Sequence, residues 1–195
     1  MKVLVFDFFG VICSEIAPFL LPKYMSTDAA IAYKATVVRD ADLGVISQQQ
    51  MFDDLSRIAR VPAQRLEEEF RAEVRIDPKV VGIVDRARKK HRVALLTNAI
   101  VPFVREVMAQ HDLERLFETI LVSAEEGLAK PDPAYYARLL ERMKAAPSEA
   151  LMIDDNPENL IGAKKAGMRA LRFQTAEQLE RDLALNGETA ADPAR

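Results

Sequence analysis

Short runs of apolar residues recur along the chain, and each has the length and uninterrupted character of a strand buried on both faces. The predicted strands cover residues 3–6, 93–96, 119–122, 150–153 and 168–172. Helical signals fill the neighbouring stretches and predict helices over 78–90, 102–110, 133–144, 157–166 and 178–185. Because strands that alternate with helices form parallel sheets, we expect an α/β fold with a three-layer, Rossmann-like core.

Residues 14–76 have a different pattern of apolar and polar residues, with helical periodicity and no convincing buried strand. Ser47 is the expected N-cap of one helix, Pro62 opens another, and residues 29–38 form a third. The pattern therefore predicts a small helical cap, inserted into the parallel-sheet core. The expected parts are a core of 1–13 and 77–186, a cap of 14–76 and a mobile polar tail of 187–195.

Composition narrows the class of protein. Apolar residues make up 49% of the chain, charged residues 29%, and the net charge is −3, so we expect neither nucleic acid nor a membrane as a partner. No apolar run approaches the ~20 residues of a membrane span, and the N-terminus lacks the features of a signal peptide. These features predict a cytoplasmic protein, whose oligomeric state the sequence does not indicate. The single cysteine, Cys13, excludes an internal disulfide.

Polar residues stand where the buried strands end. They are Asp7, Thr97, Asn98, Asp154 and Asp155, and Lys130 follows the third strand just before a helix. Because the carboxyl ends of parallel strands lie at one edge of a sheet, we expect these residues to converge there. Asp7 is the candidate nucleophile, the alternative being that it only forms a turn after its strand.

The charges at this edge predict a metal site. Asp7, Asp154 and Asp155 would place three carboxylates against the single ammonium of Lys130, and such close like charges cannot all stay ionised without help. A divalent cation supplies that help, and Mg²⁺ prefers carboxylate oxygens, carbonyl oxygens, water and substrate phosphate. A carboxylate nucleophile, a lysine, a hydroxyl and Mg²⁺ are the groups that phosphoryl transfer needs.

The same residues resemble the four motifs of the haloacid dehalogenase superfamily, in the family's order. The stretches are Phe6-Asp7-Phe8-Phe9-Gly10-Val11, Leu96-Thr97-Asn98, Lys130-Pro131-Asp132-Pro133 and Met152-Ile153-Asp154-Asp155-Asn156-Pro157-Glu158-Asn159. The helical insert is similar to the small helical cap of the family's first cap class. Within the family, the chain most resembles the phosphatase branch that contains sugar-phosphate phosphatases and the N-terminal domain of soluble epoxide hydrolases.

The resemblance implies a mechanism and a set of roles. Asp7 attacks phosphorus and forms an aspartyl-phosphate, which water then hydrolyses. The implied catalytic residues are Asp7, Thr97 and Lys130, the substrate-binding residues are Phe9, Gly10 and Asn98 through its backbone amide, and the metal-binding groups are Asp7, the Phe9 carbonyl, Asp154 through water and Asp155. Asn159 would steady the fourth motif. The expected substrate is a small phosphorylated metabolite, with Phe8, Phe9 and Phe19 forming a partly apolar mouth.

One position departs from the family pattern. Most family phosphatases carry an acid two residues after the nucleophile, where this chain has Phe9. That acid protonates the leaving group and then activates water, and general acid–base catalysis of this kind contributes typically about 10²–10⁴-fold in rate. We therefore expect slow turnover, a substrate with a good leaving group, or an acid from elsewhere, such as Glu15 or a residue of the cap.

Two alternatives to a phosphatase follow from the same position. Family dehalogenases, whose aspartate attacks carbon without a metal, carry an aromatic residue there, and Arg39 could hold the carboxylate of a haloacid. The paired acids Asp154 and Asp155 argue against a dehalogenase, because those enzymes replace the pair. The other alternative is a module that binds phosphate but has lost useful catalysis.

Overall fold

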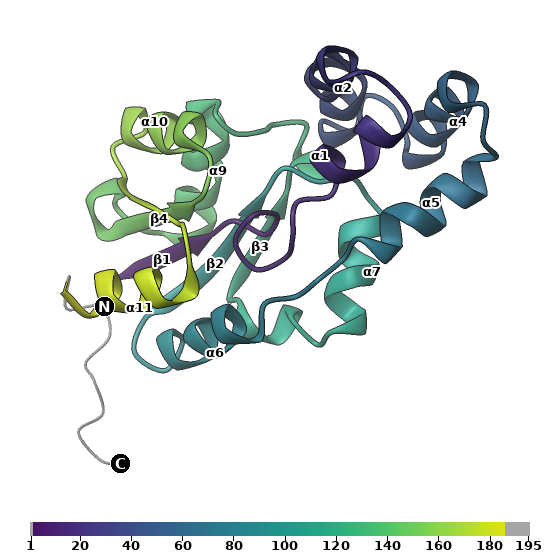
Figure 1. Cartoon of the computed structure of the whole chain (residues 1–195). Helices are drawn as coiled ribbons and strands as arrows, with labels where there is room; N and C mark the ends of the chain where they lie inside the picture. The colour runs from purple at the N-terminus through teal and green to yellow at the C-terminus, as the bar shows by residue number, and fades with distance from the viewer. Residues whose placement is uncertain (1, 186–195) are drawn as a thin grey trace.

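Five parallel strands form the centre of the molecule, of which the computed structural model describes residues 2–185 (Figure 1). The strands are β1 (Val3–Phe6), β2 (Arg92–Thr97), β3 (Thr119–Val122), β4 (Ala150–Asp154) and β5 (Arg169–Arg172), in the order β3-β2-β1-β4-β5. All neighbouring pairs are parallel, with Val3 opposite Arg92 on one side and Ala150 on the other. The predicted α/β class is confirmed, whereas the expected tail lies outside the described residues.

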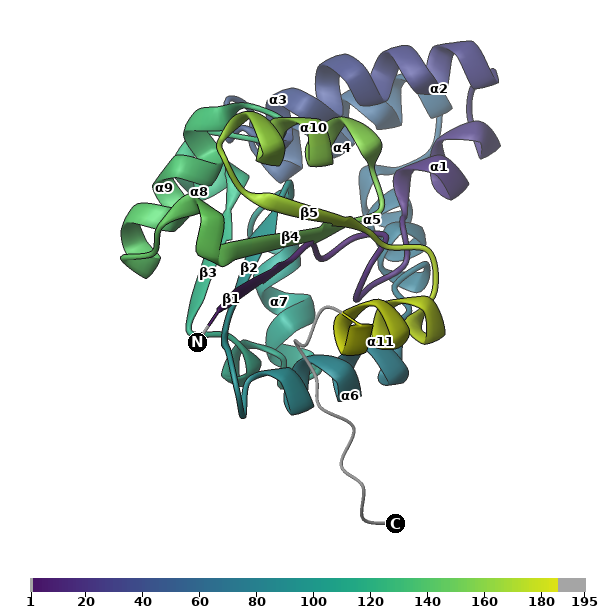
Figure 2. The same ribbon diagram turned by 90° about the vertical axis from the view of Figure 1, so that its left-hand side faces the viewer.

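Helices cover both faces of the sheet (Figures 1 and 2). One face carries α6 (Pro78–Ala87), α7 (Phe103–Gln110) and α11 (Ala176–Leu185), and the other carries α9 (Pro133–Met143) and α10 (Pro157–Lys165). In β1, Leu4 and Phe6 pack into the first layer while Val3 and Val5 pack into the second. Both faces are buried, which explains why the strand is a continuous apolar run.

Three helices of the core begin with the same N-terminal capping arrangement. Asp77, Asp132 and Asn156 each stand before a proline, and the side chain of each accepts a hydrogen bond from a backbone amide of the first turn. Proline suits the first helical position because its missing N–H would have no partner within the helix. The capping residue and the proline together fix where α6, α9 and α10 begin.

Helices and helical turns are the regular elements of residues 17–72 of the cap. Its elements are α1 (Ala17–Leu20), η1 (Leu21–Lys23), α2 (Thr27–Tyr33), η2 (Lys34–Val38, a π-helical turn), α3 (Arg39–Asp42), α4 (Gln48–Ala59) and α5 (Ala63–Ala72). The helix expected over 29–38 begins earlier, because the Ser26 side chain caps it by accepting from the Ala29 amide, and it continues through η2 into α3. Ser47 caps α4 as expected, in a reciprocal capping box with Gln50.

The cap rests directly on the core. The Phe70 ring of α5 packs against Phe103 of α7, with ring centroids 4.7 Å apart, and the Phe103 amide donates to Oε1 of Gln48 at 3.1 Å. The chain's two passages between core and cap run side by side, because the Ser14 amide donates to the Arg75 carbonyl at 2.9 Å. These contacts hold the cap over the carboxyl ends of the strands.

Short helical turns complete the described chain. They are α8 (Ser123–Glu126), η3 (Glu114–Leu116) and η4 (Pro147–Glu149). No helix is expected from the sequence where α8 lies, because a single helical turn is too short to show periodicity. None of the helices within residues 2–185 combines the length and the apolar character that a membrane span requires.

Candidate active site

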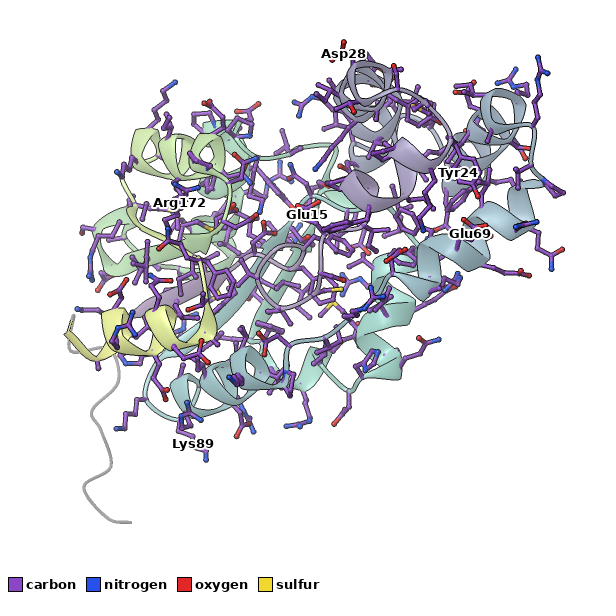
Figure 3. The ribbon with its side chains drawn as sticks, in the orientation of Figure 1. Glu15, Tyr24, Asp28, Glu69, Lys89 and Arg172 are labelled. Atoms are coloured by element: carbon purple, nitrogen blue, oxygen red, sulfur yellow. The ribbon has the colours of Figure 1, made fainter. Side chains whose placement is uncertain are left out.

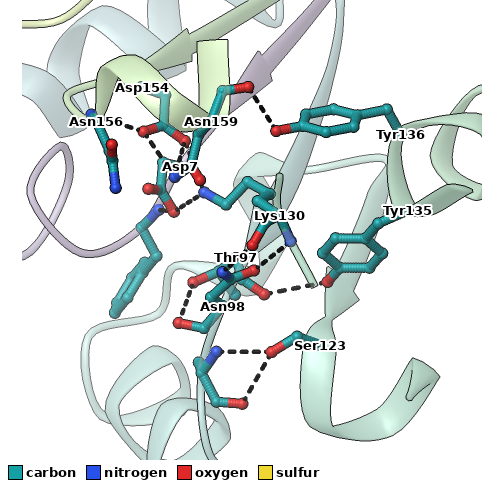
Figure 4. A network of polar contacts seen from close by, with 12 residues as sticks. Asp7, Thr97, Asn98, Ser123, Lys130, Tyr135, Tyr136, Asp154, Asn156 and Asn159 are labelled. Atoms are coloured by element: carbon teal, nitrogen blue, oxygen red, sulfur yellow. Dashed lines mark hydrogen bonds and ion pairs between the residues drawn. The ribbon is translucent and has the colours of Figure 1, made fainter. Parts of the chain in front are cut away.

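The carboxyl ends of the central strands bring the polar residues together, as the sequence predicts (Figure 4). Asp7 directly follows β1, Thr97 ends β2 and Asp154 ends β4. The Asp7 amide donates to the Ile153 carbonyl at 3.0 Å, so the ladder between β1 and β4 continues by one residue and fixes the backbone of Asp7. The three residues share one edge because their strands are adjacent and parallel.

Lys130 lies between two of the carboxylates. Its Nζ is 2.7 Å from Oδ1 of Asp7 and 2.7 Å from Oδ2 of Asp154, and all three side chains are buried. Burial alone would lower the pKa of the Lys130 ammonium, but the charges of Asp154 and Asp7 outweigh it and raise that pKa. The ammonium is therefore a permanent positive charge beside the candidate nucleophile.

Asp154 is held by more partners than the ammonium. Its Oδ1 accepts from the Asn156 amide at 2.9 Å, and Nδ2 of Asn159 donates to both carboxylate oxygens, at 3.0 and 3.1 Å. The Tyr136 hydroxyl in turn donates to the Asn159 carbonyl at 2.6 Å. Asn159 thus steadies the turn after β4, as the sequence predicts, and both carboxylate oxygens of Asp154 have hydrogen-bond partners.

Asn98 forms a clamp that sequence reasoning missed. Its Nδ2 donates to the Lys130 carbonyl at 2.9 Å, and its Oδ1 accepts from the Lys130 amide at 2.8 Å. The Tyr135 hydroxyl donates to the Thr97 carbonyl at 3.0 Å, which ties the end of β2 to α9. An asparagine next to a strand end gives no sign of which backbone it will bind, so only the folded chain reveals this clamp.

Three carboxylates form a compact cluster. Asp7, Asp154 and Asp155 each present a carboxylate oxygen within 4.8 Å of the others. Asp155 lies against the backbone of Gly10, whose φ is +83°, and a Cβ at residue 10 would come within 2.5 Å of the Asp155 carboxyl carbon. Only glycine therefore leaves room for Asp155 here.

The electrostatics of the cluster favour a bound cation. Burial, and then the charge of Asp154, raise the pKa of Asp7 well above its usual value, although Lys130 acts in the opposite direction. Burial, Asp154 and Glu15 raise the pKa of Asp155. Hard oxygen ligands under mutual repulsion are the donor set that suits Mg²⁺, so the residues present fit that ion.

A cavity of about 760 Å³ separates the cluster from the cap. Asp7, Phe9, Asn98, Lys130 and Asp155 line its polar end, whereas Thr97 and Gly10 do not line it. The cap contributes a mostly apolar wall, whose lining residues include Leu20, Ile31, Val38, Met51, Leu55 and Phe70. Glu15, where the chain enters the cap, also lines the cavity (Figure 3).

The expected aromatic mouth is only partly present. Phe9 lines the cavity and stacks on Phe103, with centroids 6.3 Å apart and planes 12° apart. Phe8 is fully buried in the core, and Phe19 is 61% exposed; neither of them lines the cavity. Of the three phenylalanines, only Phe9 can meet a substrate in this cavity.

A comparison with known protein families agrees with the geometry of the candidate active site. The family model for haloacid dehalogenase-like hydrolases matches residues 1–167. The chain belongs to this family. The resemblance to this family that the four motifs carry is therefore confirmed.

Curated relatives of this haloacid dehalogenase-like hydrolase include phosphatases. A phosphoserine phosphatase of Thermus thermophilus is 36% identical over 114 residues, which cover 56% of the chain but only 46% of that enzyme. A sesquiterpene phosphatase of Aspergillus oryzae is 26% identical over 182 residues, 88% of the chain and 89% of that enzyme. The chain thus spans about half the length of the first relative and most of the second.

Solved structures share the fold of this hydrolase. A haloacid dehalogenase family enzyme from Bacteroides thetaiotaomicron superposes with a TM-score of 0.80 at 19% identity, covering 94% of this chain and 98% of the other. A complex of that enzyme with magnesium and inorganic phosphate superposes with a TM-score of 0.74, also at 19% identity, covering 89% and 94%. At this identity the likeness establishes the fold alone.

Proposed function

We propose that this hydrolase is a Mg²⁺-dependent phosphomonoesterase that works through an aspartyl-phosphate on Asp7. The ion pair between Lys130 and Asp7, within a cluster of three carboxylates at the polar end of the cavity, carries the proposal. The phosphatases among the curated relatives support it. Phosphoryl transfer suits such a site, since its catalysis is mostly positioning and neutralisation of charge.

The metal would be held by Asp7, Asp155, the Phe9 carbonyl and, through water, Asp154. When bound, Mg²⁺ would offset the negative charge that the nucleophile and the phosphate bring together. Asp154 is the member least free to bind an ion directly, because Lys130, the Asn156 amide and Asn159 already engage its oxygens. Its role would be to orient Lys130 and water.

The chain's own groups perform the transfer. An oxygen of Asp7 attacks phosphorus, and the ester oxygen leaves on the opposite side. Lys130 neutralises charge on the nucleophile and on the phosphoryl oxygens, while the backbone amide of Asn98, which lines the cavity, binds those oxygens. Water then hydrolyses the aspartyl-phosphate and restores the carboxylate.

The substrate proposed is a small organic phosphate with an apolar alcohol part. The phosphate would sit at the polar end of the cavity, and the alcohol part would lie against the apolar wall of the cap. Removing apolar surface from water contributes roughly 25 cal/mol per Å², so an alkyl group would add affinity that a polar metabolite could not. The sesquiterpene phosphatase among the relatives is in keeping with this choice.

Hydrolysis of 4-nitrophenyl phosphate with and without Mg²⁺ tests the proposal. The wild type should release nitrophenol only with the ion, and Asp7→Asn should release none, although it keeps the shape of the side chain. A series of alkyl phosphates then tests the substrate class, and kcat/KM should rise with chain length. Release by Asp7→Asn equal to the wild type would exclude an aspartyl-phosphate on this residue.

A second candidate is a metal-free dehalogenase, which Phe9 and Arg39 at the cavity favour. It predicts halide release from a 2-haloacid in the presence of EDTA. The cluster of three carboxylates argues against it, because nothing in an attack on carbon requires three carboxylates together.

A further inference from the structure

The Phe9 side chain leaves the proposed reaction without its usual proton donor, so efficient release of a simple alcohol would need an acid from elsewhere in the cavity. The acidic side chains that line the cavity are Asp7, Glu15, Asp42, Asp155 and Glu158. Two of these, Asp7 and Asp155, belong to the carboxylate cluster. Glu15 is paired with Lys34 at 3.2 Å, and Glu158 is exposed in the first turn of α10.

We propose that Asp42 of the cap is the general acid and base of this hydrolase. It would take the role of the acid that most family phosphatases carry at the position of Phe9. The inference rests on the proposed function. It assigns a catalytic role to a residue outside the four motifs and makes the cap part of the chemistry.

The backbone around Asp42 is firmly anchored to the core. Asp42 is the last residue of α3, whose Ala41 is buried, and the following turn is closed by a bond of 2.9 Å from the Val45 amide to the Asp40 carbonyl. Gly44 in this turn has φ +70°, and a Cβ there would lie 2.4 Å from the Ala124 carbonyl oxygen of α8. Since α8 directly follows β3, α3 is held against the same edge of the sheet that carries Asp7.

The Asp42 carboxyl is available for proton transfer. The side chain is half-buried, and among the described residues it makes no hydrogen bond and no close ion pair. Burial raises its pKa to about 7; Lys34, Arg39 and Lys130 oppose this rise and Glu15 adds to it. The acids of α8 are paired elsewhere, Glu125 with Arg105 and Glu126 with Arg138 and Arg142.

A group poised near neutral pH can serve in both halves of the reaction. In the first half, the bond between Asp7 and phosphorus forms, the ester bond breaks, and the protonated Asp42 gives its proton to the departing oxygen, which leaves as the alcohol. In the second half, the Asp42 carboxylate takes a proton from the attacking water as the bond between Asp7 and phosphorus breaks. Inorganic phosphate leaves, and Asp42 is protonated again.

First-turnover rates with two esters test the proposal, using full-length protein with Mg²⁺. Asp42→Asn should slow alcohol release from a simple alkyl phosphate by about 10²–10⁴-fold, because an alkoxide needs the proton. Release of nitrophenol from 4-nitrophenyl phosphate should change far less, because that leaving group is stable as an anion, and this near-normal burst also shows that the variant is folded. Turnover after the burst should be slow, because hydrolysis of the aspartyl-phosphate lacks its base.

Two further variants sharpen the result. Asp40→Asn, an exposed neighbour that does not line the cavity, should match the wild type with both esters. Phe9→Asp combined with Asp42→Asn should recover alkyl phosphate hydrolysis. If Asp42→Asn lost equal rate with both esters, or lost none with the alkyl ester, the proposed role of Asp42 would be wrong. If the wild type released no alcohol or nitrophenol in an Asp7-dependent way from either ester, the proposed function itself would be wrong.

Discussion

Lys130 Nζ lies 2.7 Å from Oδ1 of Asp7, and neither side chain is more than 8% exposed. An ion pair in such a place is costly to form, because both charges lose their hydration. It persists here because Asp154 supplies a second carboxylate to the same ammonium at 2.7 Å. The arrangement therefore serves the placement of charge rather than stability.

Removal of this ammonium should destabilise the fold. Lys130→Met leaves Asp7 and Asp154 buried without a counter-charge, and breaking a buried pair in this way costs about 3–5 kcal/mol. Urea denaturation in the absence of divalent cations measures the free energy of unfolding. Adding Asp7→Asn to Lys130→Met should recover part of the loss, and a double variant as unstable as the single one would contradict this account.

The contact between Gly10 and Asp155 gives a prediction with a matched control. Gly10→Ala should weaken Mg²⁺ binding and lower stability by about 1–3 kcal/mol, because the new methyl group collides with the Asp155 carboxyl and the backbone is left-handed. Gly127 has φ +63°, and nothing lies within 4 Å of the place that a methyl group would take there, so Gly127→Ala isolates the backbone cost. Calorimetric Mg²⁺ titration should show weaker binding only for Gly10→Ala.

The carboxylate cluster predicts that Mg²⁺ stabilises the folded chain. A ligand that binds only the folded state adds RT ln(1 + [L]/Kd), about 2.7 kcal/mol at 100 times Kd. Thermal unfolding should shift upward with Mg²⁺ in the wild type and much less in Asp155→Asn. An equal shift in both proteins would exclude Asp155 as a ligand.

The sequence predicts the sheet and the convergence of its strand ends well, because both depend on local pattern and on the geometry of parallel strands. Asp7, Lys130 and Asp154 meet as expected for that reason. The Asn98 clamp on the Lys130 backbone was not predictable, since a side-chain amide can bind any nearby peptide. Nothing in the sequence singles out Asp42 among the acids of the cap, because its place at the cavity depends on how the cap packs on the core.

The raised pKa of Asp42 has a consequence for stability that does not depend on catalysis. The pKa of Asp42 is about 7 in the folded chain, against an ordinary pKa of 3.8. At a pH between these two values, the folded state therefore holds a proton that the unfolded chain releases. The resulting stabilisation is complete only at pH values below the ordinary pKa of 3.8, and it is lost as the pH rises through 7. At pH 8 the wild type therefore carries a buried charge that Asp42→Asn lacks, worth at most about 4 kcal/mol for a shift of this size.

Urea denaturation of the wild type and Asp42→Asn from pH 4 to pH 8 measures this linkage. Asp42→Asn should be the more stable protein at pH 8, and its advantage should shrink as the pH falls through 7 toward 4, where the carboxyl of the folded wild type is protonated. Asp40→Asn should gain no such advantage at pH 8, because that side chain is exposed. A constant difference between wild type and Asp42→Asn across this range would mean that the Asp42 carboxyl titrates near its ordinary pKa, and it could not then serve as an acid at neutral pH.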